Sequence, residues 1–384
     1  MHITLQIMVG LWRAVLLLPD ATLPFNFELK QQGDQYSMVI MNGDERVQTN
    51  PATITGDSLF IRFPVFESEF RVRVKEKKLD GVWVNYARKG NPAIPFHGTY
   101  GNTHRFEFYK PAYFDIGGRW EATMDDNTPD SSLAIGVFEQ KGDKAKGTFL
   151  ASGGDARYLE GGVTENEMWL STFDGSHCWL YKAVIDGNDM EGTYWSGNHY
   201  KSHWHAHRNE EITLPDPFSI TSVTQPLNFT FPDADSNLVS LSDEQFKNKA
   251  VIIQILGSWC PNCIDETSFL SPYYANNKDR GLEIIGLAFE KTADFHRAAG
   301  NIRRLKERYQ VEYPLLVAGV VGKEEVMKKL QGVEHFVSYP TTIYINRNGE
   351  VEKVYSGFSG PATGIEYIKY QKEFEETVEK ILAE

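Results

Sequence analysis

Cysteine is scarce in this sequence of 384 residues, which contains only Cys178, Cys260 and Cys263. Three cysteines are too few for a disulfide-stapled scaffold, so the cysteine count does not indicate a redox compartment. Long apolar runs are also missing. No stretch of about 18 consecutive apolar residues occurs, and we expect no transmembrane helix. Positive charge is sparse as well: a formal net charge of −13 argues against nucleic-acid binding, which needs clustered Lys and Arg.

The remaining composition is that of a globular protein, with 41% hydrophobic, 13% aromatic and 24% charged residues. The length exceeds what one hydrophobic core needs and predicts two or more domains. The apolar beginning, residues 1–19, has no basic n-region, carries Arg13 and lacks a small-residue cleavage pattern. We interpret it as a core β-strand. A leader removed before this beginning would leave no trace in the sequence.

Residues 1–212 have the pattern of an all-β domain. Short stretches rich in Val, Ile, Phe, Tyr and Trp alternate with Gly, Asn and Asp turn signals. In Phe25–Leu29 and Leu59–Phe63 the apolar residues recur at period two, as expected for strands with one buried face. No segment of this half has a convincing helical stripe.

This half also repeats itself. Gly10–Ala14 (GLWRA) is echoed by Gly118–Ala122 (GRWEA), and Phe27–Asp34 is echoed by Val137–Asp143. In addition, Asp80–Trp83 parallels Glu191–Tyr194. Each unit spans roughly 100 residues, which is the size of a small β module. We expect a duplicated antiparallel sandwich or barrel, with repeats at about 1–110 and 111–212.

The pattern changes after residue 212. Residues 213–224 have the Pro, Ser and Thr content of a linker. In residues 225–384, apolar runs at Ala250–Leu256 and Leu282–Phe289 predict strands buried on both faces. Helical segments follow each run, Asn348-Gly349 predicts a hairpin, and an amphipathic helix is expected at about 365–382. This order of elements predicts a C-terminal α/β sandwich.

Cys260 and Cys263 form a C-x-x-C pair (Trp259–Cys263, WCPNC) between the first buried strand and a helix. At a helix N-terminus, unpaired N–H groups and the macrodipole favour a thiolate. Such sites lower the thiol pKa from about 8.5 toward 7 or below. We therefore expect Cys260 to attack a disulfide and Cys263, on the same helix face, to resolve the mixed disulfide. Pro261 suits the first helical turn because its missing N–H is not needed there.

The strand–Trp–Cys–Pro–x–Cys–helix unit resembles thioredoxin-fold thiol–disulfide oxidoreductases of the TlpA/ResA type over residues 225–384. The resemblance implies that Pro340 is a cis-proline facing the two cysteines, in Tyr339–Thr341. It implies that Glu266 is a buried carboxylate beside the thiols, and that Gly357 lies near the active site. Trp259, Pro261, Tyr339 and Gly357 are the expected substrate-docking residues, and Cys260, Cys263, Glu266 and Pro340 the catalytic ones.

The resemblance also implies protein disulfides as substrates, a transmembrane or soluble thiol electron donor, and no bound cofactor. It implies a periplasmic or extracytoplasmic location, with a lipid anchor or other membrane attachment supplied by a leader outside this sequence. Reduction of substrates is the expected direction, although Pro-Asn between the cysteines does not fix a potential.

Several alternatives stay open at this point. A C-x-x-C pair can be half of a zinc site, but the domain offers no third cysteine, and His296 and His335 lie far apart. Glu266 can also be a solvated residue near the helix start. A peroxiredoxin places Thr three residues before its reactive cysteine, where this sequence has Gly257. Another function class is a binding protein whose β half grips a ligand while the redox domain is regulatory.

Two further features are interpreted as structural. His203, His205 and His207 alternate, so a strand would place them on one face, where imidazoles can bind copper or zinc. A polar solvated face is the commoner arrangement, and we expect no metal site. Cys178 alternates within a strand pattern and is expected to be a buried free thiol.

Overall fold

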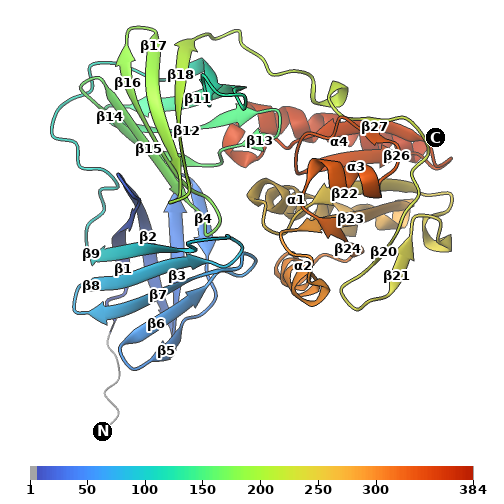
Figure 1. Cartoon of the computed structure of the whole chain (residues 1–384), viewed down its shortest axis with the longest axis horizontal. Helices are drawn as coiled ribbons and strands as arrows, with labels where there is room; N and C mark the ends of the chain where they lie inside the picture. The colour runs from blue at the N-terminus through green and yellow to red at the C-terminus, as the bar shows by residue number, and fades with distance from the viewer. Residues whose placement is uncertain (1–6, 384) are drawn as a thin grey trace. The chain divides into compact units, whose positions relative to one another are not determined.

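A computed structural model describes residues 7–383 (Figure 1). The chain forms two compact units. The first contains the residues up to Phe149 together with Ala156–Ile212, and the second contains Leu150–Asp155 together with Thr213–Glu384. The apolar beginning contains the predicted strand at Gly10–Leu17, whereas residues 1–6 of that stretch lie outside the described residues.

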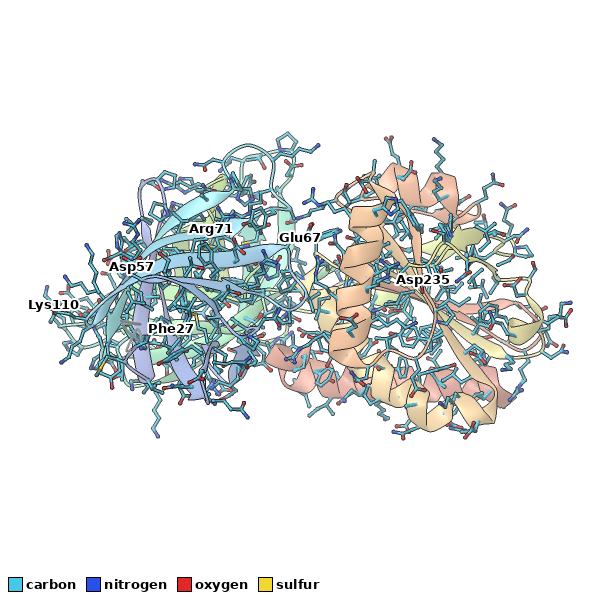
Figure 2. All side chains as sticks on the ribbon, turned by 90° about the horizontal axis from the view of Figure 1, so that it is seen from below. Phe27, Asp57, Glu67, Arg71, Lys110 and Asp235 are labelled. Atoms are coloured by element: carbon cyan, nitrogen blue, oxygen red, sulfur yellow. The ribbon has the colours of Figure 1, made fainter. Side chains whose placement is uncertain are left out.

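The first unit begins with a nine-stranded antiparallel sheet in the order β4-β3-β2-β1-β9-β8-β7-β6-β5. Its strands are β1 (Gly10–Leu17), β2 (Thr22–Gln32), β3 (Gln35–Asn42), β4 (Glu45–Gln48), β5 (Thr53–Thr55), β6 (Ser58–Arg62), β7 (Ser68–Lys75), β8 (Lys78–Asn85) and β9 (Ala93–Tyr100). No pairing among the described residues joins β4 to β5, so this sheet is a half-barrel. Buried and exposed residues alternate along the second half of β7, where Arg71 is exposed, whereas β2 is buried over a longer run that includes Phe27; Figure 2 labels both residues.

A second nine-stranded sheet follows in the order β11-β10-β18-β17-β16-β15-β14-β12-β13, and pairing of β11 with β12 closes it into a barrel. Its strands are β10 (Gly118–Met124), β11 (Ser132–Lys141), β12 (Lys144–Ala151), β13 (Gly154–Asp155), β14 (Leu159–Thr164), β15 (Glu167–Phe173), β16 (Cys178–Asp186), β17 (Asp189–Ser196) and β18 (Tyr200–Arg208). The expectation of an all-β N-terminal half is confirmed, and of the two predicted forms, sandwich or barrel, the structure shows a closed barrel beside a half-barrel.

The two sheets repeat one arrangement. In each, the first strand pairs with the second and with the last: β1 with β2 and β9, β10 with β11 and β18. Trp12 on β1 donates its indole N–H to the carbonyl of Met8 at 3.0 Å. Trp120 on β10 makes the same contact with Ile116 at 2.8 Å. The shared Trp and the shared strand order agree with the duplication that the sequence predicts.

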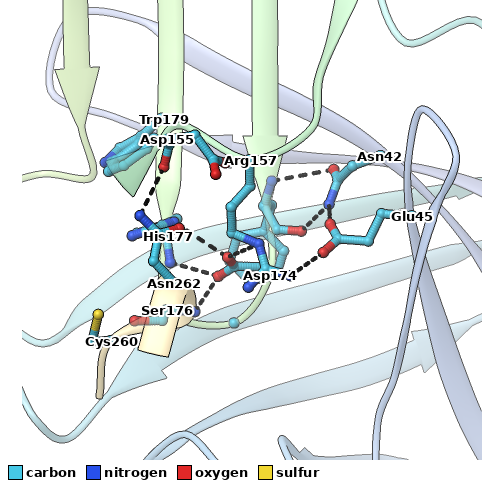
Figure 3. A network of polar contacts seen from close by, with 12 residues as sticks. Asn42, Glu45, Asp155, Arg157, Asp174, Ser176, His177, Trp179, Cys260 and Asn262 are labelled. Atoms are coloured by element: carbon cyan, nitrogen blue, oxygen red, sulfur yellow. Dashed lines mark hydrogen bonds and ion pairs between the residues drawn. The ribbon is translucent and has the colours of Figure 1, made fainter. Parts of the chain in front are cut away.

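Buried charges join the half-barrel to the barrel inside this unit. The Arg105 guanidinium donates to the Ser171 carbonyl at 2.8 Å and to the side chain of Asn42 at 3.1 Å. Arg157 lies between the carboxylates of Asp174 and Glu45, as Figure 3 shows. These groups need their partners because an unpaired charge in this position would lose hydration without compensation.

The second unit has a five-stranded mixed sheet in the order β24-β23-β22-β26-β27. Its strands are β22 (Ala250–Leu256), β23 (Leu282–Glu290), β24 (Leu315–Val320), β26 (Thr341–Ile345) and β27 (Val351–Ser356), and its helices are α1 (Pro261–Asn277), α2 (Phe295–Tyr309), α3 (Lys323–Lys329) and α4 (Ile365–Ala383). β22, β23 and β24 are parallel, and β26 and β27 run antiparallel to their neighbours. This is the thioredoxin-like α/β fold that the sequence predicts, and α1 continues through Pro272.

Both faces of this sheet are covered. Val251, Ile253 and Ile255 of β22 belong to one core with Val326 of α3. The same core includes Phe231 of a small hairpin formed by β20 (Thr230–Pro232) and β21 (Leu238–Ser240). On the opposite face, α4 packs against β26, with Tyr344 and Phe374 at 5.9 Å between ring centroids. The segment predicted as a linker contains a 3₁₀ turn, η1 (Pro217–Ser219), and a short strand, β19 (Ser222–Val223), which pairs with β25 (Val333–Glu334).

Candidate redox site

The C-x-x-C pair lies where β22 is followed by α1. Cys260 is the N-cap residue of α1 in an extended conformation, and its Sγ accepts the backbone N–H of Cys263 at 3.4 Å. Both thiols are free, Cys263 is fully buried, and 7% of Cys260 remains exposed. The cysteine closer to solvent is therefore the one that the helix N-terminus can stabilise as a thiolate.

Pro340 lies opposite this pair, and the Tyr339–Pro340 peptide bond is cis. The Cys260 thiol donates to the backbone carbonyl of Tyr339 at 3.5 Å. Gly357 donates its N–H to the carbonyl of Pro340 at 2.9 Å. The structure thus brings Cys260 together with Tyr339, Pro340 and Gly357, which lie about 80 to 100 residues further along the sequence.

Leu150–Asp155, which belongs to this unit, lies against the same loops. The Asn262 side-chain N–H donates to the Asp155 carbonyl at 3.2 Å (Figure 3), and Gly360 donates its N–H to the Asp155 carboxylate at 2.8 Å. Gly357 has φ +82°, and a Cβ there would lie 2.5 Å from the Ser152 carbonyl oxygen. Position 357 therefore requires glycine for both conformation and space.

Trp259 and Tyr339 pack beside the thiols. The Trp259 indole N–H donates to the Phe289 carbonyl at 2.9 Å, and its ring meets Tyr339 edge-on at 5.5 Å between centroids. Trp259 is partly exposed, which suits an aromatic that both packs and contacts a partner. Pro261 is the first residue of α1 and is buried, as predicted for a position that needs no N–H.

Glu266 is fully buried, in contrast to the alternative of a solvated helix residue. Its carboxylate accepts hydrogen bonds from Gln254 at 2.7 Å, from Thr342 at 2.6 Å and from Tyr370 at 3.3 Å. Burial disfavours its charged form and raises the pKa to about 7, although the three donors pull it down. A carboxyl that titrates near neutral pH can both take up and release a proton.

Cys263 is linked to this carboxyl through Gln254. The Gln254 amide donates to the backbone carbonyl of Cys263 at 3.4 Å as well as to Glu266. Burial, the neighbouring Cys260 and the charge of Glu266 all raise the pKa of the Cys263 thiol well above its usual value. Cys263 therefore stays protonated until a nearby base removes its proton.

Sequence reasoning did not identify the residues that hold Glu266. Gln254 is the one polar residue within the apolar run of β22, and that interruption is a usable signal, because a buried amide must be hydrogen-bonded. Thr342 and Tyr370 carry no such signal, since threonine in a strand and tyrosine in an amphipathic helix are ordinary.

The histidines of β18 lie on its exposed face, as strand alternation predicts. His205 pairs with Asp126 at 3.2 Å and His207 with Asp189 at 2.8 Å. In the described part of the chain, no group of three or more His, Cys, Asp or Glu side chains is placed to hold a metal ion. Cys178 is buried in β16, and burial raises the pKa of its thiol to about 12.

The helices of the chain differ from membrane spans. None of those formed by residues 7–383 combines the length and the apolar character needed to cross a bilayer.

Comparison with known proteins supports the assignment of the C-terminal unit. Residues 223–354 match the AhpC/TSA family model. The chain is similar to the thiol-disulfide oxidoreductase ResA of Halalkalibacterium halodurans, with 27% identity over 35% of this chain and 67% of that protein. It is equally similar to ResA of Bacillus thuringiensis, with 27% identity over 37% of this chain and 73% of the relative.

Among solved structures, a thiol:disulfide interchange protein described as a putative DsbE from Chlorobium tepidum aligns with 42% of this chain and 97% of its own, at 19% identity and a TM-score of 0.32. The sequence relatives confirm the resemblance that the motif suggested. The match to the family model lies within the second unit, and the β-rich first unit is an addition to it.

Proposed function

We propose that this protein exchanges electrons with protein disulfides, with Cys260 as the attacking thiolate and Cys263 as the resolving thiol. The match of residues 223–354 to the AhpC/TSA family model and the similarity to ResA oxidoreductases support this proposal. The observation that supports this most directly is the placement of Cys260. Its Sγ caps α1 and lies 3.5 Å from the Tyr339 carbonyl, beside the cis-proline. An extended peptide can pair with such a loop through its backbone.

The proposed reaction has two steps. The Cys260 thiolate attacks one sulfur of a substrate disulfide, forms a mixed disulfide, and releases the other substrate sulfur as a thiolate that takes a proton from solvent. Cys263 then loses its proton and attacks Cys260 Sγ. The mixed disulfide breaks, a Cys260–Cys263 disulfide forms, and the second substrate thiol leaves. Two electrons pass from the protein to the substrate.

Glu266 is the proposed proton acceptor in the second step. Its pKa of about 7 lets a fraction of the carboxyls be ionised at neutral pH, and an ionised Glu266 takes up the proton that Cys263 loses. Substrate reduction is the proposed direction. A transmembrane or soluble dithiol donor then reduces the Cys260–Cys263 disulfide, and an extracytoplasmic setting is part of this proposal.

Insulin reduction tests the proposal. The Cys260→Ser variant should lose turnover, and Cys178→Ala is the matched control, because it removes a buried thiol elsewhere and should leave turnover intact. Undiminished turnover in Cys260→Ser would refute the function. The Cys263→Ser variant should accumulate mixed disulfides on Cys260, and mass spectrometry of the trapped adducts names the substrates. Rapid peroxide consumption without disulfide reduction would instead favour a peroxidase.

A further inference from the structure

A second buried carboxylate, Glu290, contacts the residues that precede the C-x-x-C motif, whereas Glu266 follows the motif in α1. Glu290 is the last residue of β23 and is fully buried. One of its carboxylate oxygens accepts the backbone N–H of Ser258 at 2.9 Å. The other accepts the Ser258 hydroxyl at 2.8 Å and the Asn301 amide at 2.9 Å. Two of these three hydrogen bonds thus hold one residue, Ser258, two positions before Cys260.

The neighbours of Glu290 hold the next residue. The Phe289 carbonyl accepts the Trp259 indole N–H at 2.9 Å, and the Lys291 ammonium lies 4.6 Å from the centroid of the Trp259 ring. The last two residues of β23, Phe289 and Glu290, and the following Lys291 therefore contact Ser258 and Trp259.

The gripped segment leads directly to the attacking thiol. The Cys260 N–H donates to the Gly257 carbonyl at 3.0 Å, which closes a tight turn over Gly257–Cys260. Cys260 is therefore held from two sides. Its carbonyl accepts the first α1 hydrogen bond, from the Ile264 N–H at 3.1 Å, and its own N–H is fixed by the turn, so the position of Cys260 Sγ relative to the Tyr339 carbonyl depends on the turn as well as on the helix. A shift at Ser258 would move the sulfur with it.

A carboxylate is an expensive way to fill this space if packing were its only purpose. Burying a charge costs free energy unless strong hydrogen bonds compensate, and an apolar residue of similar volume is often as stable or more so. What a carboxylate adds is several charge-assisted hydrogen bonds from fixed directions, which restrict the donors to one geometry.

We propose that Glu290 is a positioning residue for the attacking thiol. It fixes Ser258, while Phe289 and Lys291 fix Trp259. Together these contacts align Cys260 Sγ with a disulfide bound at the cis-proline loop. The inference rests on the proposed function. It concerns alignment of the sulfur, since Glu290 contacts neither thiol through any of these bonds. Misalignment by about 1 Å can slow a reaction by up to about a hundredfold.

The test compares two substitutions in the same strand. Glu290→Gln replaces one carboxylate oxygen by an N–H₂ group that faces a donor. Glu283→Gln is the matched control: Glu283 lies near the start of β23, accepts the Tyr274 hydroxyl at 2.9 Å and pairs with Lys249. Both variants lose a largely buried carboxylate, but only Glu290 contacts the turn before Cys260.

Two rates are measured on the reduced full chain, in the parent protein and in both variants at the same pH. One is the reduction of a fluorogenic peptide disulfide, and the other is alkylation of Cys260 by iodoacetamide. We expect Glu290→Gln to slow peptide reduction about tenfold while alkylation changes by less than about twofold, because a small alkylating agent needs no alignment with the loop. Glu283→Gln should leave both rates unchanged.

Equal peptide rates in Glu290→Gln and Glu283→Gln would overturn the inference and reduce Glu290 to a structural role. A parallel loss of both rates would overturn it too, since the effect would then be on the thiol itself. If Glu290→Gln does not fold, Ser258→Ala, which removes one of the three hydrogen bonds, should still slow peptide reduction selectively. Turnover by Cys260→Ser would defeat the proposed function, whereas normal turnover by Glu290→Gln defeats only this inference.

Discussion

Replacing Glu266 by Gln should remove a pH dependence from the stability of the C-terminal unit. In the folded chain, burial raises the pKa of Glu266 from its usual 4.5 to about 7. The native state therefore holds a proton on Glu266 between these values, and the unfolded state does not. Stability falls with rising pH wherever the native state binds more protons. The stabilisation of the folded state by a protonated Glu266 is fully present below about pH 4.5 and is lost as the pH rises through about 7.

The size of the effect follows from the same shift. The difference between 4.5 and about 7, at about 1.4 kcal/mol for each pKa unit, corresponds to about 3 kcal/mol. The side-chain amide of the Glu266→Gln variant cannot titrate, so this slope should vanish. The substitution also lowers the free energy of unfolding by an amount that does not vary with pH. Its amide oxygen can still accept from Thr342 and Tyr370, but its N–H₂ group meets the N–H₂ group of Gln254, and an unmade buried hydrogen bond costs about 1–3 kcal/mol.

Hydrogen exchange followed by mass spectrometry can measure the stability of this unit separately from that of the β unit. Between about pH 4.5 and about pH 7.5, the opening free energy of peptides covering α1, corrected for intrinsic exchange, should fall by about 3 kcal/mol more in the parent protein than in Glu266→Gln. The difference between the two proteins isolates Glu266 from other titrating groups. If the two curves fall in parallel, Glu266 does not titrate near 7, and the proposed proton transfer from Cys263 loses its basis.

Two further predictions concern the β unit. Cys178 should resist iodoacetamide in the folded protein at about pH 8 and react only after urea unfolding, because burial raises the pKa of its thiol to about 12. Modification of Cys178 in the folded protein, seen by mass spectrometry, would contradict its burial. Asp174→Asn should lower the unfolding free energy by about 2 kcal/mol above about pH 4. Burial alone would raise the pKa of Asp174, but His177 and Arg157 lower it to about 2, so its contribution to stability is lost as the pH falls through about 2. Urea titrations of the parent and the variant at neutral pH should differ by this amount. Equal midpoints would show that the pairing of Asp174 does not stabilise the fold.

The order of elements in the C-terminal unit could be predicted because local signals there agree with the tertiary structure. The apolar run Ala250–Leu256 is a central strand buried at every residue, and Gly349 adopts φ +81° in the turn between β26 and β27. The β unit was predictable in class but not in closure. Its repeated Trp marks equivalent strands, whereas the pairing of β11 with β12 that closes the barrel leaves no mark on composition.

In the functional site, too, some residues could be found from the sequence and others could not. The cysteines could be found because their chemistry requires a fixed spacing at a helix start, and the resemblance supplied Glu266 and Pro340. Glu290 was missed because an acid at a strand end is ordinarily solvated. Its burial depends on Asn301 of α2 and on the turn before Cys260, which only the folded chain brings together. A signal existed nonetheless, since Glu290 ends an apolar strand that is parallel to the one leading into the motif.

That parallel relationship explains why so many functional groups meet at one edge of the sheet. β22 and β23 are parallel, so the turn before Cys260 and the end of β23 leave the sheet on the same side. β26 is antiparallel to β22, so it begins at that edge, directly after Pro340, and pairs Thr342 with Gln254. Those two side chains hold Glu266, while Glu290 holds the turn from the other neighbour. With β22 between β23 and β26, one buried carboxylate is held by side chains of β22 and β26, and the other holds the turn before Cys260 from the end of β23.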